Sequence, residues 1–283
     1  MEPIVFDLTL VRHGRTDANR QGIVQGHVDT PLDQLGIIQA TRLGRLLSKD
    51  RFDFAFSSDL KRAHLTCQLV LSQQVEDDQS KMSPVVRTLK CLRERSYGVG
   101  ENLSFSQYYQ LAADANQGTA YDFVPEGGES LSQLQSRAKE FLEIMYNYAT
   151  TGSGDELFEN CKEESTGPSE KLTQALDSLS DHDKMTIAHT VLKETPFLPE
   201  KSSQQSISCI IASHGGFIRE FMKLVTCGNP SEDVVSPEFK KLLINSPANT
   251  SFTHFTLTMN SPTEFTLTKL HYLYNVSHLN AKE

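Results

Sequence analysis

Two histidines in this sequence stand at the ends of apolar runs that are typical of buried strands. Residues 4–11 (IVFDLTLV) lead into Arg12 and His13, and residues 207–213 (ISCIIAS) lead into His214. Glycine follows each histidine, and it lets the backbone turn sharply and approach a ligand closely. Because the ordinary histidine pKa is about 6.5, a neutral ring that can attack an electrophile is available near neutral pH. The two endings therefore indicate a site for group-transfer or acid–base chemistry.

Two more reactive side chains follow shorter apolar stretches. Arg62 falls in the first turn of a helix predicted after residues 52–58 (FDFAFSS), and Glu94 follows a short strand predicted after Pro84. Ligands of open α/β sheets bind at the carboxyl ends of the strands. We therefore expect Arg62 and Glu94 to meet both histidines in one crevice. Any one of these residues alone would be an ordinary core or surface residue, and it is their combination that predicts a site.

The elements that must position these residues alternate between strands and helices. The apolar runs before the two histidines are typical of parallel strands that are buried on both faces. The predicted strands are 52–58, part of 84–92 and these two runs. The predicted helices are 37–49, 60–71, 104–121, 130–149 and 217–227, and 250–259 pairs with 264–274 in a closing hairpin. This order predicts an α/β fold, a three-layer α/β/α sandwich with a mostly parallel sheet and an antiparallel edge hairpin.

Local signals predict where some of these elements begin. Residues 14–35 are rich in Gly, Asp, Asn and Gln and are expected to form a loop. Residues 57–59 (SSD) offer N-cap chemistry for the helix over 60–71. Ser130 and Gln133 fit a capping box, which predicts a helix start at that point.

The chain is predicted to be a single domain over residues 1–283, with a polar insertion at about 151–206. This segment is dominated by Ser, Thr, Glu, Lys, Asp, Gly and Gln and has few aromatic residues. Such a composition buries little apolar surface, so we expect it to be partly disordered or loosely helical. A surface excursion without chemistry and a surface for protein partners are both open interpretations.

Composition limits the partners and the compartment. The net charge of −9 disfavours nucleic acid and anionic membranes as partners. No apolar run approaches the roughly 18 residues of a membrane helix, and the first apolar stretch reads as a strand, so we expect neither an integral membrane segment nor a secretory signal. The five cysteines are scattered and include no C-x-x-C pair. This usage favours a reducing compartment, and the expected location is cytoplasmic.

Four motifs carry a resemblance to a known family. They are RHGRTDANRQGIVQGHVDTPL around His13, SSDLKRAHLT around Arg62, LRERSYG around Glu94 and SHGG at His214. In this order they resemble the histidine phosphatase superfamily, also called the phosphoglycerate mutase-like family, over about 1–148 and 207–275. The resemblance implies that family's fold, a small phosphorylated sugar or glycerate as substrate, and no cofactor. It also allows nuclear or mitochondrial association.

The resemblance assigns roles to the residues of the crevice. His13 would be the nucleophile and become a phosphohistidine, with its other ring nitrogen held by a backbone carbonyl. Arg12 and Arg62 would grip phosphate oxygens with their forked guanidinium groups. His214, in its protonated form, would stabilise the phosphoryl group in transfer. The residues expected to bind substrate are Asn19, Gln25, Gly26, Tyr97 and Gly215.

The acid that protonates the leaving oxygen is expected to be Glu94, which would later act as base on the hydrolytic water. Arg93 and Arg95 could pair with this carboxylate and keep it ionised, whereas a nearby phosphate dianion acts in the opposite sense. Glu129 is a rival carboxylate, with a role in substrate contact or in structure. Arg15 stands where the family usually has glutamate, and it could add positive charge near phosphate or be a solvated surface residue.

The remaining histidines show no spacing that is typical of metal ligands, and no H-E-x-x-H motif is present. The sequence therefore predicts no metal site. We expect surface or core positions for His27, His64, His182, His189, His254, His271 and His278.

Residues 101–123 bear on the choice between hydrolysis and mutase activity. Mutases of the family carry basic residues in this segment, whereas here it contains no Lys or Arg, which favours a phosphatase. The implied substrate is fructose 2,6-bisphosphate, hydrolysed to fructose 6-phosphate with a restraining effect on glycolysis. The alternatives are 2,3-bisphosphoglycerate, a broad range of phosphate esters, or a weakly active phosphatase fold that serves as a binding or regulatory protein.

Overall fold

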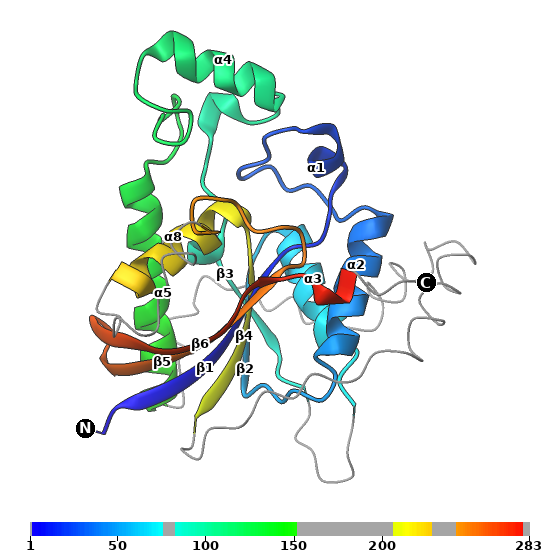
Figure 1. The fold of residues 1–283 in the computed structure, drawn as a ribbon, viewed down its shortest axis with the longest axis vertical. Coiled ribbons are helices and arrows are strands. Elements are labelled where there is room, and N and C mark those ends of the chain that lie inside the picture. Colours follow the sequence, from blue (N-terminus) through cyan, green and yellow to red (C-terminus); the bar gives the residue numbers. More distant parts are fainter. Residues whose placement is uncertain (1, 76–82, 152–205, 228–241, 280–283) are drawn as a thin grey trace.

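Six strands form one mixed sheet in a computed structural model that describes residues 2–75, 83–151, 206–227 and 242–279 (Figure 1). In the order β3-β2-β4-β1-β5-β6, the strands are Val86–Leu89, Phe54–Ser58, Ile207–Ser213, Ile4–Arg12, Phe252–Ser261 and Glu264–Asn275. Strands β1 to β4 run parallel, β5 pairs antiparallel with β1, and β6 pairs antiparallel with β5. The prediction of a mostly parallel sheet with an antiparallel edge hairpin is confirmed.

Helices cover both faces of this sheet (Figure 1). The helices α2 (Gln34–Leu46) and α3 (Lys61–Leu71) lie on one face, and α5 (Leu131–Thr151) and α8 (Gly215–Cys227) lie on the other. The sheet is thus the middle layer of three, as predicted.

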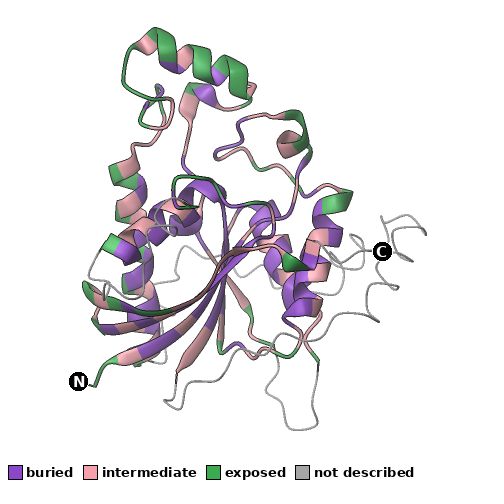
Figure 2. Ribbon diagram, in the orientation of Figure 1, coloured by how far each residue is buried: buried purple, intermediate pink, exposed green. Residues whose placement is uncertain are grey.

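Strand β1 shows how alternation builds two cores. Leu8 and Leu10 join the large apolar cluster that includes Phe141 of α5 and Phe221 of α8. Val11 points to the opposite face and joins the cluster of α2 and α3. Figure 2 shows the resulting pattern, with buried residues along the sheet and on the sides of the helices that face it. Burial of such side chains stabilises the fold by about 1.5–3 kcal/mol each.

A small cap stands beyond the carboxyl ends of the parallel strands (Figure 1). It contains α1 (Asp17–Gln21), α4 (Phe105–Ala115) and their loops. Val24, Tyr108 and Phe123 pack together there as a separate apolar cluster. Short 3₁₀ turns complete the described structure: η1 (Lys90–Leu92), η2 (Gly98–Gly100) and η4 (Ser277–Leu279).

Several predicted boundaries differ from the structure. The expected loop over 14–35 contains α1, because Thr16 and Asn19 form a capping box that begins a short helix. The N-cap expected within 57–59 is wrong: the N-cap of α3 is Leu60, which has no side-chain cap bond. The Asp59 carboxylate instead forms an ion pair with Arg93, with 2.6 Å between Arg93 Nη2 and Asp59 Oδ2.

Two other helix starts have clear causes. Helix α2 begins three residues earlier than predicted, because the Asp33 side chain accepts a hydrogen bond from the Gly36 N–H and serves as its N-cap. The capping box of Ser130 and Gln133 is present at the start of α5, as predicted. Both cases follow from side chains that satisfy otherwise free N–H groups.

The insertion expected at about 151–206 falls almost wholly outside the described residues, and the single-domain prediction stays a prediction. Within the ranges that the structure does describe, no helix is long and apolar enough to cross a membrane.

Candidate active site

The two histidines leave neighbouring strands side by side. Strands β1 and β4 pair in parallel with Arg12 opposite Ser213, so the next residue on each strand is a histidine. The backbone N–H of His13 donates to the Ser213 carbonyl at 2.9 Å. The ring centroids of His13 and His214 lie 5.1 Å apart, and both residues are almost fully buried. Sheet register therefore brings together residues that are two hundred positions apart.

His13 is held in the form that a nucleophile requires. Its Nδ1 lies 2.7 Å from the Gly14 carbonyl oxygen, so Nδ1 carries the proton and Nε2 keeps its lone pair. Burial, with the nearby Arg62 and Arg12, lowers the pKa of His13 well below 6.5. Gly14 permits the close turn, since a Cβ there would lie 2.5 Å from the Gly36 carbonyl oxygen.

The structure favours the neutral form of His214, whereas the resemblance implied a protonated ring. Burial, together with the positive charge of Arg62, lowers its pKa well below 6.5, so the ring is neutral at physiological pH. Neither ring nitrogen has a hydrogen-bond partner within the described part of the chain. A phosphate dianion beside the ring would act in the opposite sense and favour the imidazolium form.

Two arginines flank the histidines. Arg62 is 1% exposed and donates to the carbonyl oxygens of Val28 and Gly26 at 2.7 and 2.8 Å. Arg12 donates to the Pro247 carbonyl oxygen. The Nε of each arginine is buried without an acceptor among the described residues. Burial lowers the pKa of Arg62 to about 10, so its guanidinium group remains charged and able to bind an anion.

Glu94 is fixed at the start of α8. Its carboxylate accepts hydrogen bonds from the backbone N–H groups of Arg95, Gly216 and Phe217 at 2.8, 3.0 and 3.2 Å. A Cβ at Gly216 would lie 2.3 Å from Glu94 Oε1, so glycine allows this approach. The contact holds the carboxylate against the helix that follows His214.

The arginines beside Glu94 do not pair with it. Arg93 forms a two-pronged ion pair with Asp59, at 2.7 and 2.6 Å. Arg95 donates to the backbone carbonyl oxygens of Tyr121, Phe123 and Glu129. Glu129, the rival carboxylate, pairs with Arg137 at 2.6 Å and does not line the cavity. The side chains of Arg93 and Arg95 are thus engaged elsewhere, and Glu129 does not compete with Glu94 for the acid role.

These side chains surround a cavity of about 300 Å³ between the sheet and the cap. This volume is at the lower end of the range for small-molecule sites. Of the residues predicted from the sequence, the following line it: Arg12, His13, Asn19, Gln25, Gly26, Arg62, Glu94 and Tyr97. Two predicted residues do not line it: His214, whose ring centroid is 5.1 Å from that of His13, and Gly215, where a Cβ would lie 3.5 Å from the Arg12 guanidinium group. Gly216, one residue further, lines the cavity in place of Gly215.

The sequence did not predict several of the residues that line the cavity. Arg219 of α8 is one of them, and its guanidinium carbon lies 4.0 Å from the ring centroid of Tyr121. Arg219 lies three residues after Gly216, and this spacing places two helical residues on one face. That spacing is the signal that could have identified Arg219. The other cavity residues absent from the prediction are Ile23, Val24, Arg95, Phe105, Tyr108, Tyr109, Ala120, Tyr121 and Ser246.

Arg15 takes a structural position rather than a place in the cavity. Its Nε lies 2.7 Å from Asp33 Oδ2, and its side chain is 32% exposed. Since Asp33 also caps α2, the ion pair joins the loop after β1 to that helix. Neither of the two interpretations open at the sequence level describes this arrangement.

Comparison with known proteins identifies the class. The family model of the histidine phosphatase superfamily (branch 1) matches residues 8–153, about half of the chain. The chain belongs to the histidine phosphatase superfamily. It is a phosphoric monoester hydrolase.

Individual relatives narrow the resemblance. The chain is similar to fructose-2,6-bisphosphatase TIGAR of Xenopus laevis, with 32% identity over 260 residues that cover 90% of this chain and 88% of that protein. A 2,3-bisphosphoglycerate-dependent phosphoglycerate mutase of Rhizobium etli is 34% identical over 141 residues, which are 48% of this chain and 65% of that one. The phosphoglycerate mutase structure from Bacillus anthracis has a TM-score of 0.62 at 18% identity and covers 98% of this chain and 96% of its own. This last likeness concerns the fold alone.

Proposed function

We propose that the protein hydrolyses small phosphorylated metabolites through a phosphohistidine on His13. The observation that carries the proposal is the ring of His13, which is neutral, holds its Nδ1 proton on Gly14 and leaves Nε2 free. That ring lines the cavity together with Arg12 and Arg62. In the proposed first step, Nε2 attacks phosphorus and the bond to the leaving oxygen breaks. Water then attacks the phosphohistidine and releases inorganic phosphate.

Charge stabilisation falls to the arginines. Phosphoryl transfer spreads negative charge over three equatorial oxygens, and catalysis consists mainly of positioning and electrostatic stabilisation. The Nε groups of Arg12 and Arg62 are buried and have no protein acceptor in the described chain, so they are suited to donate to such oxygens. His214 would gain a proton as the anion arrives and then stabilise the transferred group.

Glu94 is proposed as the acid and base of the two steps. Among the described residues that line the cavity, it is the one carboxylate. Its three N–H donors fix the orientation of the carboxyl group. In this role Glu94 gives a proton to the leaving alkoxide and later takes one from the attacking water.

We propose fructose 2,6-bisphosphate as the substrate, with fructose 6-phosphate as the product and a restraint on glycolysis as the consequence. Arg219 supports a bisphosphate, because it brings a further cation to the cavity besides Arg12 and Arg62. The similarity to fructose-2,6-bisphosphatase TIGAR over most of both chains points to the same substrate.

2,3-Bisphosphoglycerate is the second candidate substrate. It is favoured by the phosphoglycerate mutase relatives and would use the same arginines of the cavity. The lack of Lys and Arg in residues 101–123 still favours hydrolysis over mutase activity. The lack of basic residues in this segment is weaker evidence against mutase activity than the sequence alone suggested, since Arg95 and Arg219 line the cavity from outside the segment.

Steady-state kinetics of the purified protein test this proposal. We expect kcat/KM to be higher for fructose 2,6-bisphosphate than for fructose 6-phosphate, 2,3-bisphosphoglycerate and 3-phosphoglycerate. Inorganic phosphate should be released without transfer to a second acceptor. Mutase turnover above hydrolysis would contradict the proposed reaction. Turnover no faster than that of His13→Ala on every ester would favour a binding or regulatory protein instead.

The setting of this activity is also part of the proposal. We propose one catalytic domain over 1–283, in the cytoplasm, with residues 151–206 available to protein partners. The polar composition of that segment and the scattered cysteines support these assignments. Fractionation of cells that express the full chain would test the location.

A further inference from the structure

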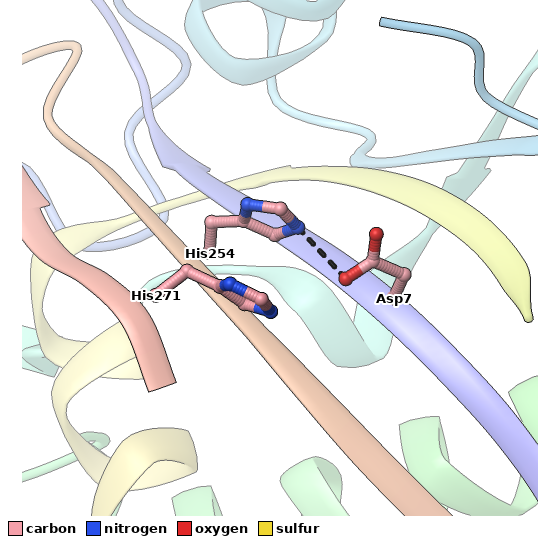
Figure 3. Close-up of side chains that lie close together, drawn as sticks. All are labelled: Asp7, His254 and His271. Carbon is pink, nitrogen blue, oxygen red and sulfur yellow. Dashed lines mark hydrogen bonds and ion pairs between the residues drawn. The ribbon is translucent and has the colours of Figure 1, made fainter. Parts of the chain in front are cut away.

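A second cluster of ionisable side chains lies on the sheet, away from the cavity. Asp7 of β1, His254 of β5 and His271 of β6 project from three successive strands (Figure 3). One potential ligand atom from each residue lies within 4.8 Å of the others. His254 Nε2 is 2.8 Å from Asp7 Oδ1, and the two imidazole rings stack with centroids 4.5 Å apart. The sequence did not predict this cluster.

The cluster is separate from the phosphatase site. Asp7 precedes His13 by six residues on an extended strand, which is roughly 20 Å. None of the three side chains lines the catalytic cavity. Its chemistry is therefore independent of the proposed reaction.

The three donors suit a borderline metal ion. Two imidazole nitrogens and a carboxylate oxygen are ligands that Zn²⁺ and similar divalent ions accept. An imidazole with the ordinary pKa of about 6.5 is largely neutral at pH 7 and so offers a lone pair to a metal ion. The Asp7 side chain is 28% exposed and that of His254 8%, which leaves a route for an ion on the Asp7 side.

Asp50 adds a second acidic group beside the cluster. It lies in the turn after α2, where burial and the Asp7 carboxylate raise its pKa to about 6, against the opposing influence of His254 and Arg51.

We propose that Asp7, His254 and His271 bind one divalent transition-metal ion of the Zn²⁺ type on the face of the sheet. Two ligands of one tetrahedral ion stand roughly 3.4 Å apart, so the donors need to move by only about an ångström. The ion would replace the hydrogen bond between Asp7 and His254. The His271 ring, now 18° from parallel with His254, would turn out of its contact with Thr256.

The consequence of binding is mechanical. The edge strand β6 is held to the sheet by β5 alone. An ion shared by β1, β5 and β6 would join the hairpin to the central parallel strands. Since the ion binds the folded chain and not the unfolded one, it would raise the thermal midpoint.

Titration of zinc chloride into the metal-free, full-length protein tests the proposal. A Cys227→Ser background removes an exposed free thiol that could bind zinc independently. By isothermal titration calorimetry we expect one ion per chain and a rise in the thermal midpoint. Co²⁺ in place of Zn²⁺ should give the visible absorption bands of a tetrahedral site.

Variants separate this site from others. His271→Gln, at a half-buried edge position, and Asp7→Asn should each lose the bound ion and the thermal shift. His64→Gln and His13→Ala should keep both. Circular dichroism in the absence of metal shows whether each variant folds. The proposal is overturned if the parent binds no zinc saturably, or if binding survives both cluster substitutions, or if it is lost in His13→Ala.

Discussion

The protonation state of His13 is set by its contact with Gly14 and by its buried, cationic surroundings. The Gly14 carbonyl oxygen holds the Nδ1 proton at 2.7 Å. Burial opposes a second proton by lowering the pKa of His13, and the positive charges of Arg62 and Arg12 add to this effect. The arginines proposed to bind phosphate therefore also help to keep the proposed nucleophile neutral, which couples the two roles.

This coupling predicts an unusual pH dependence. An unperturbed histidine would gain a proton, and lose its nucleophilic lone pair, as the pH falls through about 6.5. Because the folded-state pKa of His13 is well below 6.5, its neutral form persists below that pH. We expect the acid limb of kcat/KM, which reports the free enzyme, to lie below pH 6.5. An acid limb centred at or above pH 6.5 would contradict this account of the site.

The acid role of Glu94 predicts a dependence on the leaving group. Glu94→Gln keeps the shape and removes the proton donor, so kcat for sugar phosphates should fall by about 10²–10⁴-fold. p-Nitrophenyl phosphate has a leaving group that departs without a proton, so formation of the phosphohistidine should be nearly unchanged. Single-turnover kinetics on both esters measure the difference. Equal losses on both would assign Glu94 to binding or folding instead.

At the scale of elements, the start of α8 positions two of the proposed catalytic residues, His214 and Glu94. The helix follows His214 directly, and the N–H groups of Gly216 and Phe217 hold the Glu94 carboxylate. One turn later, Arg219 lines the same cavity. A single helix thus helps to position the proposed stabilising ring, the proposed acid and a further cation.

Gly216→Ala tests this arrangement. A Cβ at this position would lie 2.3 Å from Glu94 Oε1, so the carboxylate must move. We expect the same selective loss on sugar phosphates as in Glu94→Gln, with p-nitrophenyl phosphate spared in the first step. Gly118→Ala is the control for a strained glycine substitution away from Glu94: its φ of +83° disfavours alanine, but a Cβ there meets only the Asp122 side chain, at 3.9 Å or more. Unchanged sugar-phosphate turnover in Gly216→Ala would show that the position of Glu94 is not critical.

The sequence predicted the elements better than their contacts. Apolar alternation and the motifs around His13, Arg62, Glu94 and His214 sufficed for the parallel sheet and the crevice at its end. The helix α1 was missed because five residues are too few for a periodic signal. The Asp7, His254 and His271 cluster was missed because it depends on the register of β5 with β6, which shifts at several points.

At the scale of the whole molecule, the charge of the cavity lining is opposite in sign to the net charge of the chain. The chain carries a net charge of −9, yet four arginines, Arg12, Arg62, Arg95 and Arg219, line one cavity between the sheet and the cap. Only Glu94 opposes them among the described lining residues. A cationic cavity of about 300 Å³ in an acidic protein favours small anionic ligands over polyanions.

Arg219 should contribute more to kcat/KM for substrates with two phosphates than for substrates with one. A charge-assisted hydrogen bond contributes about 1.5–3 kcal/mol, so Arg219→Ala should lower kcat/KM for fructose 2,6-bisphosphate by roughly 10- to 100-fold. The loss should be smaller for p-nitrophenyl phosphate. Lys223→Ala is the matched control, since Lys223 contacts the same Tyr121 at 2.8 Å but does not line the cavity. Equal losses on both substrates would remove Arg219 from recognition of the second phosphate.

The central claim is that His13 carries the phosphoryl group, and trapping that intermediate tests it most directly. Rapid acid-free quenching of the enzyme with ³²P-labelled fructose 2,6-bisphosphate, followed by peptide mass spectrometry, locates the label. We predict an acid-labile, base-stable phosphate on His13 that is absent from His13→Ala and accumulates in Glu94→Gln with p-nitrophenyl phosphate. A label on any other residue, or one retained in His13→Ala, would contradict the account.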